Sequence, residues 1–440
     1  MRKNYTKPQG ERSCGLFNIE WGNRMEQRTV GMAFPSRRLI LYLVYAAVFL
    51  APLNGFLFYV PLVPAALFAL VRRVRYGRGE WELGPLAKPA ALFFAFSFGS
   101  ILFSYDRAFS LLNWILLPVM YGALYVMILS YVNTRRAQKQ LFRCLFYSSI
   151  GVVLYGLFQF THIQTMSDAI AAQDWVDPAR FPLLFRRFYS TLENPNLCAG
   201  YLLMLMSLIG ARGLFERKRE RKWTQLAFVG VLILCLLLTY SRGAWVSLAV
   251  MAAVLGYLYD RRIWLAFLLI PVVLLVYHGQ ITERFLSLFS GEDTSTILRF
   301  ALWESTIAMI EEHPLLGVGW GAYFKAYPEY NFFVGDPEVI IFHAHNMYLS
   351  ILAEVGIPGG LSYFWFFFAH FFGAVRLYRT SADPFLKSAG LGAALAISGM
   401  AAYGVGDYVL FSRAVSITFW TLCAYAVACG KSGEKYRQES

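Results

Sequence analysis

The stretch LLNWILLPVMYGALYVMILSY, Leu111 to Tyr131, runs apolar on every face of a helix and lacks the polar stripe of a surface helix. It has about the 20 residues that span the hydrocarbon core of a bilayer. Similar blocks recur along the 440-residue chain, which is 58% hydrophobic with a mean hydropathy of +0.48. A helix satisfies its own backbone in lipid, and no series of short alternating segments predicts a barrel. We therefore expect an all-α polytopic membrane protein.

The apolar blocks predict about twelve transmembrane helices, so both termini should lie on one side of the membrane. Two pairs of spans are separated by very short breaks, at Asn54-Gly55 and at Arg242-Gly243. The predicted spans are residues 39–54, 55–71, 89–104, 111–131, 141–161, 196–214, 224–241, 243–259, 263–279, 346–372, 387–405 and 409–428.

The Lys and Arg residues are divided unevenly between the two sides of this path. If both termini are cytoplasmic, 31 of the 40 lie in inner segments. The positive-inside rule explains this bias and the net charge of +13, so we expect membrane lipids and no nucleic acid as partners. The domains are then a cytoplasmic tail at 1–38, a transmembrane domain at 39–428 and a second tail at 429–440.

Two outer segments are long, and the larger, 278–345, is too long for an idle connection. Within it, STILRFALWESTIAMIEE has apolar residues at helical spacing, which predicts a helix with Ser295 as a candidate cap and Pro314 beyond its end. GVGWG, at 317–321, resembles a nucleotide loop but lacks a βαβ context, so we interpret it as a turn.

Arg242, in LLLTYSRGAWVSLAV, lies between two apolar runs at the outer membrane edge. An arginine there is costly and usually has a partner or a function. A tight Ser-Arg-Gly turn would let its guanidinium bind phosphate oxygens, and the alternative is a loop arginine that extends to the interface.

His345 ends the long outer segment and begins the next span. A neutral imidazole at this depth can act as a general base toward a sugar hydroxyl, with Asn346 orienting the imidazole or the sugar. The alternative is an ordinary helix start with Asn346 as its cap. His343 and His345 supply only half of a tetrahedral ligand set, and the six cysteines form no CxxC pair, so we expect no metal and no disulfide framework.

Three other charged residues are weaker candidates. Arg186 and Arg187, in LFRRFYSTLENPN, are either substrate-binding residues or simple surface charges. Asp407, between the last two spans, is either functional or an ordinary loop carboxylate. From the residues alone, these alternatives stay open.

Four segments carry a family resemblance: FYSTLENPNLCAGYL (188–202), TYSRGAW (239–245), the Arg299 helix leading into HPLLGVGWGAYF (313–324), and HNMYLSILAEVGIPG (345–359). In this order they resemble the O-antigen ligase and polymerase superfamily of bacterial inner-membrane glycosyltransferases. The last segment fits the ligase spacing of His-Asn, nine residues, Gly, two residues and Gly. The resemblance covers about 188–410.

The resemblance implies a GT-C-type glycosyltransferase that needs neither metal nor cofactor. Its donor would be a glycan on undecaprenyl diphosphate, bound at the periplasmic face of the inner membrane. His345 would be the base that activates the acceptor hydroxyl, and Arg242 would hold the diphosphate. Arg299 would be a second arginine from the large periplasmic loop, and Asp407 an acidic residue near the last spans. His343, Asn346, Arg186, Arg187 and Asp407 are grouped as substrate-binding.

We therefore expect an O-antigen ligase-type enzyme that joins a glycan to a lipid A core or similar acceptor. The alternatives, in order, are an O-antigen or capsule polymerase, a protein O-oligosaccharyltransferase and a transporter of lipid-linked glycans. The notable charges collect at one outer face and no internal repeat is found, which favours chemistry over transport.

Overall fold

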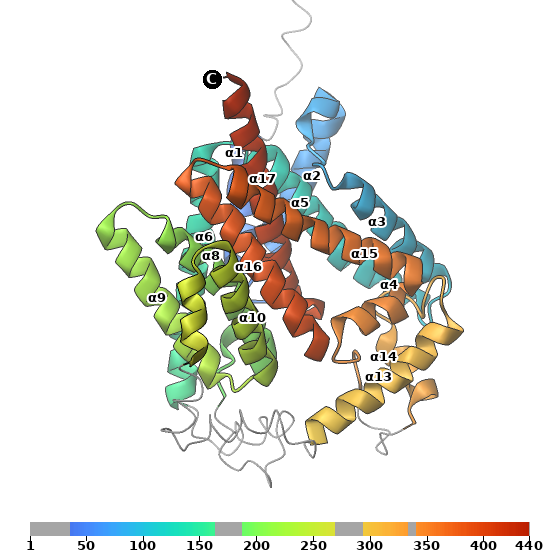
Figure 1. Ribbon diagram of the computed structural model, residues 1–440. Coiled ribbons are helices and arrows are strands. Elements are labelled where there is room, and N and C mark those ends of the chain that lie inside the picture. The colour runs from blue at the N-terminus through green and yellow to red at the C-terminus, as the bar shows by residue number, and fades with distance from the viewer. Residues whose placement is uncertain (1–35, 163–186, 269–293, 333–339, 440) are drawn as a thin grey trace, which may run out of the picture. The chain divides into compact units, whose positions relative to one another are not determined.

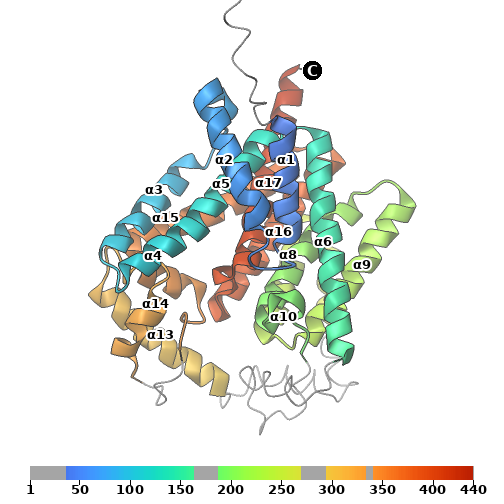
Figure 2. The same cartoon turned by 180° about the vertical axis from the view of Figure 1, so that it is seen from behind.

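The computed structural model describes residues 36–162, 187–268, 294–332 and 340–439 (Figures 1 and 2). Arg37–Ser440 forms one compact unit, and its described part contains helices and no strand. The α-helices are α1 (Arg37–Leu50), α2 (Tyr59–Tyr76), α3 (Ala87–Leu102), α4 (Arg107–Trp114), α5 (Met120–Tyr131), α6 (Arg135–His162), α8 (Pro195–Leu214), α9 (Arg219–Leu238), α10 (Arg242–Leu258), α13 (Thr294–Glu312), α14 (Tyr323–Ala326), α15 (Met347–Thr380), α16 (Pro384–Gly406) and α17 (Arg413–Glu439). A π-helical turn, η2 (Ile115–Val119), joins α4 to α5, and short 3-10 helices are η1 (Arg78–Glu80), η4 (Ser190–Leu192), η5 (Arg261–Leu268), η6 (Tyr327–Tyr330) and η7 (Val409–Phe411).

Seven of the described helices are long and apolar enough to cross a membrane, with α4 to α5 counted as one. The other six are α6, α8, α9, α15, α16 and the Arg413–Gly433 part of α17, while α3 and α10 are apolar but shorter. The chain is thus a multi-pass membrane protein. Eleven of the predicted spans overlap described helices, and the remaining one, 263–279, begins in η5 and continues outside the described residues. The total of twelve stays a prediction.

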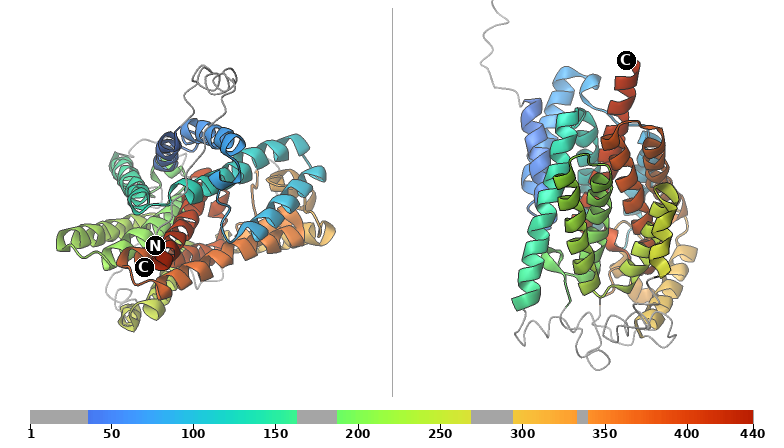
Figure 3. Two further views of the ribbon diagram at one scale, coloured as in Figure 1. Left: turned by 90° about the horizontal axis from the view of Figure 1, so that it is seen from above. Right: turned by 60° about the vertical axis from the view of Figure 1, so that its left-hand side comes forward.

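The interior of the bundle is built from α8, α16 and α17. Fifteen residues of α8 are buried, whereas α9, on the outside, buries only Leu232, Cys235 and Leu236. Glycines in α16 permit close packing: a Cβ at Gly392 would lie 3.0 Å from the Cα of Leu208 in α8. The five cysteines in the described part of the chain are free thiols. Figure 3 shows the long helices running side by side between two edges of the bundle.

Helix α15 is kinked at Gly356, where φ is 72° and ψ is 173°. The opened backbone pairs with residues 314–318: Val318 N donates to Ala353 O at 2.8 Å, and Ile357 N donates to Pro314 O at 2.7 Å. A Cβ at Gly356 would lie 2.3 Å from Leu315 O, so glycine is required there. The predicted turn at 317–321 is confirmed, and it docks on α15.

The described part of the large outer segment folds around α13 and α14, at the edge of the bundle opposite the C-terminal end of α17 (Figure 1). The predicted helix is confirmed as Thr294–Glu312, but Ser295 lies inside it, so the assignment of Ser295 as the cap is wrong. Buried residues of α13 and α14 pack with Ala344 and Ala353 in a small second core. This core fixes the segment that leads into α15.

Candidate active site

Several polar residues meet where helices begin or end at the edge that carries α13. Arg187 precedes η4, Asn196 lies in the first turn of α8, and Arg242 is the first residue of α10. His343 and His345 precede α15, and Asp407 follows α16. The four described non-glycine residues with positive φ, namely Ser190, Glu193, Tyr240 and His345, occupy the same junctions. Such strained residues cluster at functional sites.

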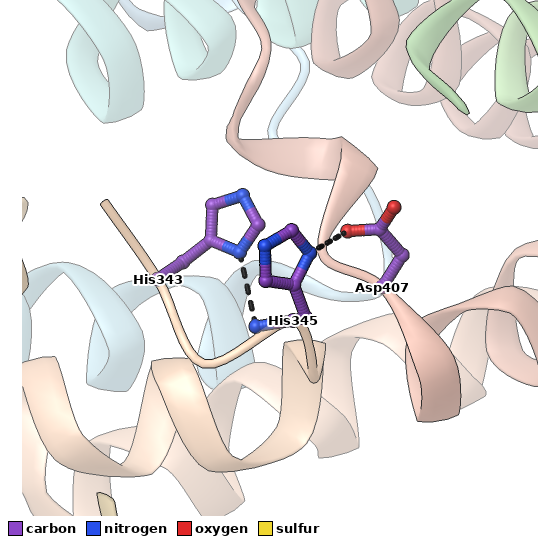
Figure 4. A group of neighbouring side chains, drawn as sticks. All are labelled: His343, His345 and Asp407. Carbon is purple, nitrogen blue, oxygen red and sulfur yellow. Dashed lines mark hydrogen bonds and ion pairs between the residues drawn. The ribbon is translucent and has the colours of Figure 1, made fainter. Parts of the chain in front are cut away.

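The centre of the site is the pair His345 and Asp407 (Figure 4). His345 Nδ1 lies 3.0 Å from Asp407 Oδ1, and the two side chains are 38% and 6% exposed, respectively. An ionised carboxylate can only accept a hydrogen bond, so Nδ1 carries the proton. This leaves the lone pair on Nε2 of a partly exposed imidazole, which is the arrangement of an oriented general base.

The Asp407 carboxylate accepts two further hydrogen bonds, from Asn196 Nδ2 at 2.9 Å and from the backbone N–H of Tyr408 at 2.8 Å. Burial alone would raise the pKa of this carboxyl, but the hydrogen bond from His345 and nearby positive charge hold it below its usual value. Asp407 is therefore a fixed anion beside the imidazole, and its interpretation as an ordinary loop carboxylate is wrong.

His343 fixes the segment around His345. Its Nδ1 accepts a hydrogen bond from the His345 backbone N–H at 3.1 Å, and the two rings lie 4.5 Å apart. Burial, with smaller effects of the nearby His345 and Arg299, lowers the pKa of His343 to about 3, so it is neutral at physiological pH. His345 itself has φ 48°, and this contact supports that left-handed conformation.

Arg187 is only 5% exposed, so its interpretation as a simple surface charge is wrong. Its Nε donates to Thr239 O at 2.8 Å, and its Nη2 donates to Asn196 Oδ1 at 3.3 Å. Through Asn196, this guanidinium is linked to Asp407 and so to His345. Arg186 lies outside the described residues.

Arg242 is also buried, at 6% exposure, and it begins helix α10 rather than lying in a loop. The preceding residue, Ser241, shares a 2.7 Å hydrogen bond with the Tyr403 hydroxyl, and Tyr403 donates to Asn196 O at 3.1 Å. The structure therefore anchors the start of α10 to the same network. The interpretation of Arg242 as a loop arginine that extends to the interface is wrong.

Arg299, from α13, acts electrostatically on both His343 and Asp407. The large outer segment thus contributes a positive charge near the site, and binding of a diphosphate by Arg299 stays a prediction. Asn346 caps α15: its Oδ1 accepts from the N–H groups of Tyr348 and Leu349, and its Nδ2 donates to Val405 O. The cap interpretation is confirmed, and direct contact of Asn346 with substrate stays a prediction.

The site contains a possible ligand set for a metal. His343, His345 and Asp407 each offer one ligand atom, and these atoms lie within 4.8 Å of one another. Counting only the two imidazoles missed the carboxylate of Asp407, which follows α16 and is distant in the sequence. Two imidazoles and a carboxylate suit a transition metal. However, Asp407 Oδ1 is engaged by His345, and the Arg299 charge disfavours a cation.

Two residues of this network, Asn196 and Tyr403, are absent from the sequence-based candidates. Asn196 stands within the NPN segment of FYSTLENPNLCAGYL, where an apolar run begins, and a polar residue at that position was the available signal. Tyr403 lies in an apolar block of α16 and carries no comparable signal. Its role follows only from the packing of α16 against α8 and α10.

These features define a class: a multi-pass helical membrane protein with a histidine–carboxylate pair and arginines gathered at one edge, suited to group transfer. Residues 200–364 match the O-antigen ligase family, so this part of the chain is similar to members of that family. The match includes Arg242, Arg299 and His345 and ends before Asp407.

Part of the chain is also similar to a curated protein. Over 163 residues the chain is 28% identical to the exopolysaccharide production protein ExoQ of Rhizobium meliloti (strain 1021). The aligned part is 34% of this chain and 37% of the relative, so the similarity spans about a third of either protein.

Proposed function

We propose that the protein transfers a glycan from undecaprenyl diphosphate to a hydroxyl of a lipid A core or a similar acceptor. The observation that carries this proposal is the His345–Asp407 pair, which is formed by the histidine of the family-matched segment and a buried carboxylate. An oriented imidazole with a free Nε2 is what activation of a sugar hydroxyl requires.

The reaction divides between base and leaving group. His345 Nε2 takes the proton of the acceptor hydroxyl as its oxygen forms a bond to the anomeric carbon of the donor sugar. The bond between that carbon and the diphosphate oxygen breaks, and the lipid diphosphate leaves with the electron pair. Asp407 stabilises the imidazolium that forms, as a buried carboxylate does for a histidine base.

Positive charge stabilises the leaving diphosphate in this proposal. Arg242 and Arg299 are the arginines expected to bind it, and Arg187 is linked to the same network through Asn196. Guanidinium groups bind phosphate oxygens with two parallel hydrogen bonds, so they can supply without metal what a divalent cation supplies elsewhere.

The second candidate is polymerisation, in which the acceptor is a glycan on another lipid carrier. The similarity to an exopolysaccharide production protein favours this alternative. The spacing from His345-Asn346 to Gly356 and Gly359 favours the ligase. Both reactions use the same base and the same leaving group.

The proposed location is the bacterial inner membrane, with the site on the periplasmic face. It follows from the concentration of Lys and Arg at the other edge, which the positive-inside rule assigns to the cytoplasm together with both termini. Lipid-linked glycans would then reach the site from the outer leaflet.

The test is a transfer assay with purified protein, an undecaprenyl-diphosphate glycan and rough lipopolysaccharide, performed in chelator. Glycosylated lipopolysaccharide that is lost in His345→Ala would support the ligase. Lengthening of the donor glycan without modification of the acceptor would indicate the polymerase. Retained transfer in His345→Ala would remove His345 as the base.

A further inference from the structure

A cavity of about 940 Å³ lies beside the candidate active site, bordered by α2, α3, α5, α15 and α17. Its walls are mostly aliphatic and aromatic, with Phe93, Leu117, Tyr363, Phe366 and Trp420 among them. Cavities of this size, apolar with few polar groups, are typical of ligand sites.

The cavity extends through much of the depth of the bundle. Phe56, Phe342 and Arg413 line it at the edge of the site, and Leu70 and Trp81 line it toward the other edge. Along α4 and α5 its lining runs from Phe109 to Met127, which is about 27 Å at 1.5 Å per residue. The hydrocarbon core of a bilayer is about 30 Å thick, so the cavity has the length of a lipid chain.

One wall of the cavity is shared with the active site. Tyr408 and Phe411 line the cavity, and their rings pack against His343 with centroid separations of 5.8 and 4.5 Å. The Tyr408 N–H also donates to Asp407. The Tyr408 and Phe411 rings therefore form a wall shared by the cavity and the His343 side of the site.

The cavity has a cation at the end nearest the site. Arg413 begins α17, and its guanidinium lies over the Phe56 ring at 4.5 Å. Among the described residues, no carboxylate forms an ion pair with it. Two carboxylates also line the cavity: Glu354 accepts hydrogen bonds from backbone N–H groups of 321 and 323, and Glu193 is exposed. Arg413 can thus receive an anion.

The position of the cavity distinguishes the two substrates. Arg242, assigned to the donor diphosphate, begins α10, and Arg187 connects to His345 through Asn196 and Asp407, so both lie on the side of α8 and α10. Arg299 comes from α13. The cavity borders the site through Tyr408 and Phe411, whose rings contact His343, on the side of α2, α3 and α17. Figures 1 and 2 show α8 and α10 on one side of the bundle and α2 and α3 on the other.

We propose that this cavity holds the hydrocarbon chain of a phosphorylated glycolipid acceptor and that Arg413 pairs with its phosphate. The assignment to the acceptor rests on the proposed function, whereas the binding of such a lipid can be measured without any transfer. A water-soluble acceptor would not need this cavity.

The test is native mass spectrometry of the purified full chain, titrated separately with rough lipopolysaccharide, undecaprenyl-diphosphate glycan and phosphatidylglycerol. Arg413→Gln keeps a polar side chain that can donate hydrogen bonds but removes its charge, and it should weaken binding of rough lipopolysaccharide about tenfold. Arg107→Gln is the matched control, because Arg107 also begins a helix at this edge and does not line the cavity. Ala123→Phe, which fills the cavity from α5, should weaken the same binding.

The outcomes separate this inference from the proposed function. The proposal is supported if Arg413→Gln and Ala123→Phe weaken the binding of rough lipopolysaccharide and of no other lipid, even if no transfer is detected with any acceptor. In a transfer assay, the KM for the acceptor should rise while kcat and the KM for the donor stay unchanged. If the two variants weaken binding of the undecaprenyl-diphosphate glycan equally, the cavity belongs to the donor. If phosphatidylglycerol binds as tightly as rough lipopolysaccharide, the cavity is a site for bulk lipid. If neither variant changes the binding of rough lipopolysaccharide, the cavity is not its binding site. Each of these three results overturns the proposal.

Discussion

Replacement of Asp407 by asparagine tests the central feature of the site. The change keeps the size of the side chain but removes the charge that accepts hydrogen bonds from His345, Asn196 and Tyr408. An asparagine oxygen in the place of Oδ1 can still accept from His345 and Tyr408, but its NH₂ group would then face the Nδ2 donor of Asn196. The imidazole loses the anion that stabilises its protonated form, and the opposed amide donors disturb its orientation.

The expected loss follows from the energy of one hydrogen bond to a charged group, about 1.5–3 kcal/mol. At about 1.4 kcal/mol per tenfold change, transfer should fall about 10- to 150-fold. The loss should appear in kcat more than in the KM of either substrate, because Asp407 contacts His345 rather than substrate.

The assay measures initial rates of transfer to rough lipopolysaccharide with wild type, Asp407→Asn and Asp106→Asn. Asp106 lies at the same edge and caps α4, a role that asparagine also fills, so its variant should keep nearly full activity. Protein of each variant must elute from detergent gel filtration like wild type. Activity of Asp407→Asn within twofold of wild type would refute the argument that this carboxylate orients the base.

Four further outcomes are expected. Gly356→Ala should introduce backbone strain of about 1–3 kcal/mol and so lower the unfolding temperature. Gly230→Ala, with open space around its Cβ, should leave the unfolding temperature unchanged. Arg242→Lys should insert normally and lose most transfer because lysine lacks the guanidinium fork, and full activity would show that a point charge suffices. Excess chelator should leave transfer unchanged, and a loss that a divalent cation restores would assign a metal to the ligand set of His343, His345 and Asp407. Folding lowers the pKa of Asp407, so this carboxylate stabilises the fold above its ordinary pKa of 3.8, and the stabilisation is lost as the pH falls further. Between about pH 5 and pH 3, the unfolding temperature of Asp407→Asn should therefore fall less than that of wild type.

The membrane spans are the part of the fold that the sequence predicts best, because they depend on the preference of apolar residues for lipid over water. Eleven predicted spans overlap described helices, and boundaries differ most where polar residues extend a helix beyond the apolar block: α6 begins at Arg135 rather than 141, and α15 continues to Thr380 rather than 372. Hydropathy does not mark such extensions. The kink at Gly356 follows from pairing with the 314–319 segment, which apolar periodicity cannot reveal.

The candidate site was predicted as a set of residues but not as a structure. His345 and Arg242 stand out because histidine and arginine are conspicuous beside apolar runs, whereas Arg299 follows only from the family resemblance. Arg187 and Asp407 could not be separated from surface charges, because burial depends on which helices pack around them. Asn196 was missed for the same reason.

The sequence by itself determined the class of protein, the edge at which the polar residues gather and the family segments, because hydropathy, charge bias and residue spacing are properties of the local chain. Only the tertiary structure decided that His345 binds Asp407, 62 positions away, and that Asn196 reaches the same carboxylate from 211 positions away. These contacts depend on the close packing of α16 against α8 and α15. That packing is set by the shapes of whole helix faces, which the spacing of residues in one segment does not specify.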